Sequence, residues 1–307
     1  MDNRKRVNGG CRRMNIPANI KFLSIVIANY NYGQFLEEAI LSVLRQCDLN
    51  MRLPTGDHIE LIIVDGGSTD DSVRIIKKYA DRLAWWCSEK DRGQSHAFNK
   101  GFSKASGKLL TWLNADDILL PGTLEALKHA SDRHPECEWF TGNYLQFDQD
   151  TRKIIFAPWG AHILPTFLQT FNSPLVIFGP TTFWSRQAYL KVGDIDETLH
   201  YSMDTDYWLR MKKHGYRQRR LNHCCWAFRM HSASKTAQYG TREIDEDIRS
   251  RWYQELRFVN QKVGYRCPLY LRLLGLIMRF WDGSALVASY RWLFIVGKNV
   301  DALYRLD

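Results

Sequence analysis

The chain has 307 residues, of which 45% are hydrophobic and 24% are charged. This composition is typical of a folded globular protein and argues against a disordered chain. The seven cysteines form an odd set without a Cys-x-x-Cys pair, which argues against a disulfide framework and a zinc ribbon. The formal net charge of +9 predicts attraction to an anionic partner, and charge alone leaves open nucleic acid, phospholipid headgroups or a diphosphate-bearing substrate.

Residues 1–20 are rich in Arg, Lys, Asn and Gly and lack the apolar core of a secretory signal, so we expect a basic N-terminal tail. No uninterrupted apolar run reaches the ~20 residues that a membrane-spanning helix needs. We therefore expect a cytoplasmic protein, and we leave open a peripheral contact with the inner face of the cell membrane.

The first third of the sequence alternates between short apolar runs and amphipathic stretches. The apolar runs are rich in β-branched residues, as expected for strands buried on both faces of a parallel sheet, and cover residues 22–28, 59–64, 83–87 and 109–113. Stretches with helical spacing separate them, at residues 35–44, 73–79 and 96–104. This alternation predicts an α/β fold with a doubly wound, mostly parallel sheet, whose ligands lie beyond the carboxyl ends of the strands.

The remaining sequence predicts further helices and strands and then changes character. We expect a helix at 121–129, a hairpin of 139–147 with 153–156, an irregular crossing over 158–180, a helix at 203–213 and a strand at 219–229. Beyond residue 241 the pattern becomes Arg-rich helices with Leu, Ile, Trp and Tyr. We place a domain boundary there, between a catalytic domain at 21–240 and a helical extension at 241–307. The extension either lies on an anionic membrane surface, packs back onto the catalytic domain or forms a dimer contact.

Acidic residues recur where predicted buried elements end, at Asp65, at Asp116 with Asp117, and at Asp204 with Asp206. The predicted topology brings these residues toward one edge of the sheet. Carboxylates held close together repel one another, so such a cluster usually needs a cation or an incoming donor group. Mg²⁺ or Mn²⁺ binds carboxylate oxygens on one side and phosphate oxygens on the other. The acidic cluster therefore predicts diphosphate chemistry with a divalent metal.

Five motifs follow one another along residues 21–236: Ser24–Asn31, Val64–Asp70, Asp91–Gly101, Asn114–Asp117 and Met203–Asp206. In this order they resemble the motifs of family 2 of the inverting nucleotide-sugar glycosyltransferases, typified by bacterial polysaccharide and O-antigen enzymes. The resemblance implies the GT-A fold, with the doubly wound sheet described above and the helical extension attached to it. It also implies a nucleotide-diphosphate sugar as donor.

The resemblance assigns the nucleotide to residues at the ends of the first strands. Ala28 and Tyr30 are implied to lie at the nucleotide, and Asp65 to accept a hydrogen bond from an N–H group of the base. Asp116 would accept a hydrogen bond from the ribose, and Asp117 would coordinate the metal. An alternative for Asp65 is that it only caps the turn that follows it.

The family's Asp-x-Asp signature is altered in this chain, because Asn114 stands two residues before Asp116. Fewer acidic ligands are therefore left for the ion. His231 matches a loop that in relatives reaches the metal or the diphosphate, although a lone histidine also suits a structural role. Arg229 and Lys235 flank His231 and either neutralise the leaving diphosphate or are solvated surface charges.

On the acceptor side, the resemblance implies that Asp204 is the general base. An acceptor hydroxyl must lose its proton as it attacks the anomeric carbon opposite the diphosphate, so a carboxylate is needed there. The alternative is that Asp204 is the N-cap of its helix. Asp206 is expected to form hydrogen bonds behind the base or to contact the acceptor. Thr182 and Trp184 lie where the family places an acceptor-side loop, although core packing is the commoner role for a tryptophan.

Together these features predict a metal-dependent, inverting glycosyltransferase of polysaccharide or cell-envelope biosynthesis. The donor would be a UDP-, GDP- or dTDP-sugar, and the acceptor a hydroxyl of a glycan or lipid-linked saccharide. The alternatives are a non-catalytic sugar-nucleotide binder and a sugar nucleotidyltransferase, although the turn after the first strand lacks the Gly-rich phosphate loop of the latter. A nucleic-acid-binding protein would explain the charge but not the acidic residues at the strand ends, so no nucleic-acid partner is expected.

Overall fold

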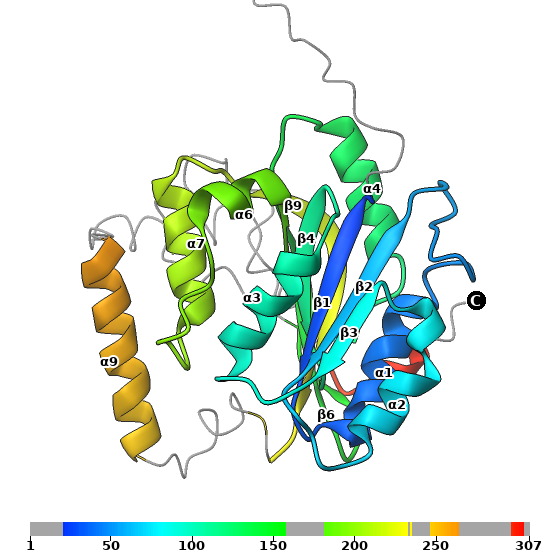
Figure 1. Ribbon diagram of the computed structural model, residues 1–307, viewed down its shortest axis with the longest axis horizontal. Coiled ribbons are helices and arrows are strands. Elements are labelled where there is room, and N and C mark those ends of the chain that lie inside the picture. The colour runs from blue at the N-terminus through cyan, green and yellow to red at the C-terminus, as the bar shows by residue number, and fades with distance from the viewer. Residues whose placement is uncertain (1–20, 158–180, 233, 235–245, 264–295, 304–307) are drawn as a thin grey trace, which may run out of the picture.

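The computed structural model describes residues 21–157, 181–232, 234, 246–263 and 296–303 (Figure 1). Within these residues, nine strands form one sheet in the order β3-β2-β1-β4-β8-β6-β9-β5, with β7 paired to β6. Helices cover both faces of the sheet, which is the α/β arrangement that the sequence predicts (Figure 1). The expected basic tail and the irregular crossing lie outside the described residues.

The first half of the sheet is parallel. It consists of β1 (Leu23–Asn29), β2 (Ile59–Asp65), β3 (Trp85–Ser88) and β4 (Leu109–Asn114). The central strands are continuous apolar runs because helices cover them on both faces. β1 lies between β2 and β4, and its register pairs Asn29 with Asp65 and Ala28 with Asn114. The carboxyl ends of these strands therefore meet at one edge, as predicted.

The second half of the sheet is mixed. It consists of β5 (Ile118–Leu119), β6 (Trp139–Asp148), β7 (Ile154–Phe156), β8 (Thr182–Ser185) and β9 (Arg219–Met230). The predicted hairpin is confirmed as the antiparallel pair of β6 and β7. β8 pairs antiparallel with both β4 and β6 and joins the two halves of the sheet. β9 runs parallel to β6 and ends near the carboxyl end of β4.

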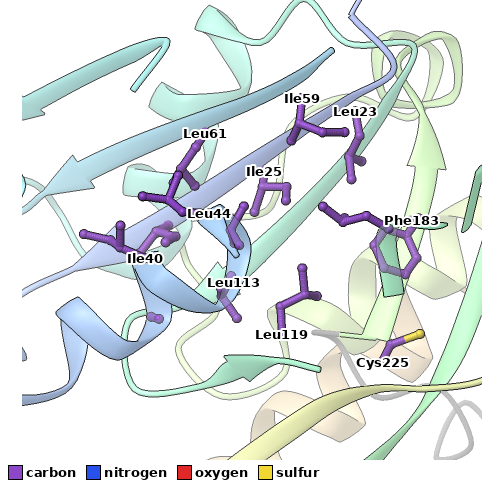
Figure 2. Close-up of a cluster of buried hydrophobic side chains, with 14 of the residues drawn as sticks. Leu23, Ile25, Ile40, Leu44, Ile59, Leu61, Leu113, Leu119, Phe183 and Cys225 are labelled. Carbon is purple, nitrogen blue, oxygen red and sulfur yellow. The ribbon is translucent and has the colours of Figure 1, made fainter. Parts of the chain in front are cut away.

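The helices divide between the two faces of the sheet. They are α1 (Gly33–Leu44), α2 (Ser72–Lys78), the 3-10 turn η1 (Ala80–Arg82), α3 (Gln94–Lys104), α4 (Thr123–Arg133), α6 (Arg186–Val192) and α7 (Met203–Lys213). Because side chains alternate along a strand, Ile25 and Ile27 pack with α1, α2 and α4, whereas Val26 packs with α3, α6 and α7. Figure 2 shows the first of these clusters, where Ile40 and Leu44 of α1 lie against the strands. Each such aliphatic side chain contributes about 1.5–3 kcal/mol on burial.

The second core cluster is dominated by aromatic rings. Trp112 of β4 stacks on Trp208 of α7 with ring centroids 5.3 Å apart, and Trp184 of β8 meets both rings edge-on. Trp184 is fully buried. The expectation that it belongs to an acceptor-side loop is therefore wrong, because β8 turns this side chain into the core.

Two described segments lie beyond residue 241, and both contact the elements that form and cover the sheet. Helix α9 (Glu246–Val263) packs beside α7 and buries Val259 completely. The 3-10 turn η4 (Val300–Leu303) follows a bridge between Lys153 and Asn299. The domain boundary itself and the Arg- and Trp-rich stretch after residue 263 lie outside the described residues. Among the helices of the described ranges, none has the length and apolar character required to cross a membrane.

Candidate active site

Asp65, at the end of β2, is the centre of a hydrogen-bonded turn. Its side chain is fully buried. One oxygen accepts from Asn29 Nδ2 at 2.6 Å and Ser68 Oγ at 2.5 Å, and the other accepts from Ser68 N at 2.9 Å and Ser88 Oγ at 2.6 Å. A carboxylate offers about four lone-pair sites, so these internal donors occupy Asp65. This geometry is that of a residue that caps the following turn. The hydrogen bond from the nucleotide base to Asp65 stays a prediction.

Tyr30 and Asp91 form an open corner beside this turn. The Tyr30 residue is 60% exposed. A Cβ atom added to Gly66 would lie 2.7 Å from Asp91 Oδ2 and 3.3 Å from the Tyr30 ring, so the glycine is needed for this close approach. Asp91 carried no assigned role in the sequence analysis, although it opens the Asp91–Gly101 motif. The signal that could have found it is the glycine at the position after Asp65.

A chain of polar contacts runs across the carboxyl end of β4. Asn114 Nδ2 donates to Asp117 Oδ2 at 2.8 Å, and Gln94 Nε2 of α3 donates to Asn114 Oδ1 at 3.0 Å. Asn114 therefore uses both ends of its amide, which an aspartate at this position could not do. Ala28 is half-buried beside Asn114 on β1. These contacts give a structural reason for the altered Asp-x-Asp signature.

Asp116 and Asp117 have opposite environments although they are neighbours in the chain. Asp117 is fully buried, and its two oxygens accept from Asn114 and from Arg229 N, the latter at 3.1 Å. Burial and the nearby charge of Asp116 raise the pKa of Asp117 well above its usual range. The Asp116 side chain is 13% exposed and accepts from His231 Nε2 at 3.1 Å. The contacts of Asp117 thus speak against direct metal coordination, and Asp116 suits that role better.

His231 is held in place by aromatic rings. Its imidazole lies 4.5 Å from the Phe35 ring and 5.6 Å from the Tyr32 ring, measured between centroids, and its side chain is only 7% exposed. Burial, together with the charges of Asp116 and Asp117, raises the pKa of Tyr32 to about 12. The phenol therefore stays protonated at neutral pH. The structure pairs His231 with Asp116, whereas the sequence-based assignment gave the metal to His231 and Asp117 and the ribose to Asp116.

Arg229 anchors the Asp116–Asp117 turn from inside the protein. Its side chain is 1% exposed, its Nε donates to the Asp116 carbonyl at 2.6 Å, and its guanidinium pairs with Glu38 at 2.5 Å. The rings of Phe35 and Phe147 flank the guanidinium, each with its centroid 4.9 Å away. The expectation that Arg229 is a solvated surface charge is therefore wrong, and its role in neutralising the diphosphate stays a prediction. Lys235 lies outside the described residues.

Glu38 and Arg152, whose side chains are partly exposed, complete the ionic network around the buried Arg229, and neither was predicted from the sequence. Glu38 on α1 accepts from Arg152 at 2.6 Å as well as from Arg229, and Arg152 also pairs with Asp301 of η4. Burial alone would raise the pKa of Glu38, but the two guanidinium groups outweigh burial and lower it. The network thus joins α1, the β6–β7 hairpin and η4 behind the site.

Helix α7 carries the residues expected on the acceptor side. Asp204 is the second residue of the helix, and the N-cap residue is Ser202, so the expectation that Asp204 is the N-cap is wrong. The Asp204 side chain is partly exposed, and its Oδ1 accepts from Thr205 N at 2.6 Å. Asp206 is fully buried and pairs with Arg210 at 2.7 Å. Thr182 is also fully buried, in β8, which removes it from the surface that an acceptor could reach.

The start of α7 lies at the same edge of the sheet as the other polar residues. Ser95 Oγ in the first turn of α3 is 3.0 Å from Met203 Sδ in the first turn of α7, and Gln94 precedes Ser95. Gln94 in turn contacts Asn114 at the end of β4. Figure 1 shows α3 and α7 side by side on one face of the sheet. A continuous run of contacts therefore connects the helix of Asp204 with the Asp116–Asp117 turn.

A doubly wound sheet with acidic and amide side chains at the carboxyl ends of β1, β2 and β4 defines the class of GT-A nucleotide-sugar proteins. The sequence profile of glycosyl transferase family 2 matches residues 24–192, more than half of the chain. The chain belongs to this family.

A glycosyltransferase of Rickettsia typhi, described as uncharacterized, is 28% identical over 193 residues, which are 61% of this chain and 58% of that protein. The chain spans 31% to 58% of the length of the first curated relatives that it matches. Two solved structures share the fold. TarS of S. aureus, in complex with UDP-GlcNAc, has a TM-score of 0.56 at 14% identity and covers 92% of this chain and 83% of its own. The mannosyltransferase PcManGT of Pyrobaculum calidifontis, in complex with GDP-Man and Mn²⁺, has a TM-score of 0.52 at 16% identity, with 91% and 88% covered.

Proposed function

We propose that this protein transfers a sugar from a nucleotide-diphosphate donor to a hydroxyl of a glycan or lipid-linked saccharide, with inversion at the anomeric carbon. The observation that carries the proposal is the contact between Asp116 and His231 at the carboxyl end of β4. From there, contacts of Asn114 and Gln94 lead to the start of α7, which carries Asp204. Membership of family 2 supports the same activity. TarS and PcManGT, which share the fold, were solved with UDP-GlcNAc and GDP-Man, so UDP- and GDP-sugars are the first donors to test.

Asp204 is the proposed general base. Its carboxylate is partly exposed in the first turn of α7. Asp204 would accept the proton of the acceptor hydroxyl while that oxygen attacks the anomeric carbon from the side opposite the diphosphate. Asp206 would act only through α7, because its carboxylate is buried against Arg210.

Asp116 and His231 are the proposed protein ligands of a divalent ion. In the described part of the chain, no group of three or more His, Cys, Asp or Glu side chains is arranged to hold a metal. One carboxylate and one imidazole nevertheless suit Mg²⁺ or Mn²⁺ in a site completed by phosphate oxygens, since Mg²⁺ often binds through one or two carboxylates plus a substrate phosphate. The ion would stabilise the negative charge of the departing diphosphate. Asn114 and Arg229 hold the peptide that carries Asp116.

The nucleotide is proposed to occupy the corner formed by Ala28, Tyr30 and Asp91. The exposed Tyr30 ring offers a stacking surface for a base. Donors within the protein occupy the oxygens of Asp65, so we propose that Asp91 supplies the carboxylate that faces the nucleotide. Asp91 Oδ1 accepts a hydrogen bond from Gly93 N at 2.8 Å. We retain Asp65 as the residue that shapes this corner and Asp116 as a neighbour of the ribose.

The test of this function is turnover of UDP-GlcNAc, GDP-mannose and dTDP-glucose by the wild-type chain and by Asp204→Asn. We expect hydrolysis or transfer with at least one donor and a loss of about 10²- to 10⁴-fold in kcat in the variant, the usual contribution of a general base. Donor affinity should be unchanged, because Asp204 lies outside the nucleotide corner. Equal rates for the two proteins would refute the base assignment. Binding of a donor without any turnover by wild type would favour a non-catalytic sugar-nucleotide binder.

A further inference from the structure

Helix α9 supplies a carboxylate to the loop immediately before α7. Glu255 Oε1 accepts from His200 N at 3.0 Å, and its Oε2 accepts from Tyr201 N at 2.7 Å and Ser202 N at 2.9 Å. Ser202 is the N-cap residue of α7, yet its side chain makes no capping hydrogen bond. The backbone ahead of the helix is therefore held by a residue that lies 53 positions farther along the chain.

Helix α9 also supplies a cation to the same region. Lys262 Nζ lies 2.5 Å from Asp196 Oδ2 and 3.2 Å from Asp206 Oδ1. Burial alone would lower the pKa of Lys262, but the hydrogen bond to Asp196 and the charge of Asp206 raise it. Because Asp206 is fully buried, it needs a fixed cation on each side, and Arg210 and Lys262 provide them.

Side chains of α9 thus contact both the first turn of α7 and the loop before it. Glu255 holds the peptide before the helix, and Lys262 pairs with Asp206, the fourth residue of the helix. Val259, between them on α9, is packed in the core. Asp204 lies within this turn, and its side chain bonds to the adjacent backbone N–H of Thr205. The orientation of the Asp204 carboxylate therefore depends on the position of this backbone, which the hydrogen bonds to Glu255 hold in place.

We propose that Glu255 is a positioning residue for Asp204, and that α9 is a built-in part of the acceptor side of the site although it lies beyond the family match at residues 24–192. This inference rests on the proposed function of Asp204. Misplacement of a reacting group by about 1 Å can cost about 10²-fold in rate. Loss of the Glu255 contacts therefore affects turnover more than donor binding.

The test compares Glu255→Gln with wild type, using whichever of UDP-GlcNAc, GDP-mannose and dTDP-glucose the wild type turns over. In Glu255→Gln an amide NH₂ replaces one carboxylate oxygen and cannot accept from a backbone N–H. Some of the hydrogen bonds to residues 200–202 are therefore lost, while the shape of the side chain is kept. We expect kcat to fall about 10- to 100-fold and the donor KM to stay within about twofold. Glu255→Asp keeps the charge but is shorter, and it should give an intermediate kcat. Glu125→Gln on α4, whose side chain is 58% exposed, is the matched control and should behave as wild type.

Hydrogen exchange tests the hydrogen bonds of Glu255 to the backbone independently of catalysis. In Glu255→Gln, the amides of residues 200–202 should exchange at least about tenfold faster than in wild type, because they lose an anionic acceptor. Unchanged exchange, or faster exchange with an unchanged kcat, would overturn the proposal. A wild type that turns over none of the donors, or Asp204→Asn with full activity, would instead show that the proposed function itself is wrong, whatever the exchange data say of Glu255.

Discussion

At the residue scale, Gly66 and Gly101 lie in motifs of the same family but have different neighbours. A Cβ atom on Gly66 would meet the carboxylate of Asp91 at 2.7 Å and the ring of Tyr30 at 3.3 Å. A Cβ atom on Gly101 of α3 would instead collide with the Val26 side chain, which is fully buried in β1. The first glycine serves the open corner, and the second serves the packing of a helix on the sheet.

We predict that Gly66→Ala weakens nucleotide binding by about tenfold, equivalent to about 1.4 kcal/mol, because Asp91 and Tyr30 must move apart. Its unfolding free energy should change by less than about 1 kcal/mol, since the displaced carboxylate is at a surface. Gly101→Ala should do the reverse, with a loss of about 1–3 kcal/mol in stability and unchanged binding. Calorimetric titration with UDP and GDP, together with urea unfolding, measures both quantities. Identical binding by the two variants would contradict the placement of the nucleotide.

The buried guanidinium of Arg229 leads to a second prediction at this scale. Arg229→Met removes one of two cations from Glu38 and the donor to the Asp116 carbonyl. Breaking a buried ion pair costs about 3–5 kcal/mol, and we expect the lower end because Arg152 still pairs with Glu38. The control is Arg74→Met. Arg74 and its partner Asp71 are both exposed, so this substitution should leave the unfolding free energy nearly unchanged. Denaturant unfolding curves of both variants decide the matter, and equal losses would count against the network.

The same residues mark the limit of what sequence predicts about a site. The position of an acidic pair after β4 follows from the strand pattern, and it was found. The difference between Asp116 and Asp117 does not follow, because burial of one neighbour depends on the backbone N–H of Arg229 and the amide of Asn114. The inward direction of Arg229 depends on Glu38, which is 191 residues away in the chain. Such pairings are products of the folded topology and leave no local signature.

At the element scale, the accuracy of prediction follows the strength of the local signal. β1, β2 and β4 are continuous apolar runs, and their observed bounds lie within about two residues of those predicted, as is usual for strongly patterned segments. β5 has only two residues, too few for a periodicity, and was not predicted. The four-residue β8 was also not predicted. α6 was also missed, because it follows β8 directly and begins only at the Ser185 cap.

The docking of α9 on α7 gives a pH prediction. Burial alone would raise the pKa of Asp196, but hydrogen bonds from Lys262 and Thr198 outweigh burial and lower it from 3.8 to about 2. A lowered folded-state pKa means that this contact contributes its full stability above pH 3.8 and loses it as the pH falls through about 2. Asp206 pairs with the same lysine and also with Arg210.

We therefore expect α9 amides to exchange progressively faster as the pH falls from about 4 to about 2, after correction for intrinsic exchange rates. In Asp196→Asn the contact is absent at every pH, so α9 should exchange faster already at neutral pH and show less change in the acid range. An acid response of α9 in the variant equal to that of wild type would disprove the role of Asp196.

At the scale of the whole molecule, the two halves of the sheet supply different parts of the site. The parallel half brings Tyr30, Asp65 and Asn114 to one edge. The mixed half returns β9 beside the end of β4 and so delivers His231 to Asp116. Both described segments beyond residue 241 are fastened to this framework, α9 through Glu255 and η4 through the ionic network. The acidic cluster is embedded in a chain of net charge +9, which favours the approach of an anionic donor.

This division predicts that metal and nucleotide stabilise the protein together. Asp116 and His231 alone offer an ion too few ligands, so Mn²⁺ without nucleotide should change the melting temperature little. A ligand at about 100 times its Kd adds about 2.7 kcal/mol to the folded state. We expect this shift with a nucleoside diphosphate plus Mn²⁺, and a smaller one when EDTA is present, because the ion joins the diphosphate oxygens to the protein. In Asp116→Asn, Mn²⁺ should add nothing beyond the nucleotide alone, whereas Asp150→Asn, in the exposed turn between β6 and β7, should retain the full effect. If EDTA leaves the shift of wild type unchanged, the ion has no part in donor binding.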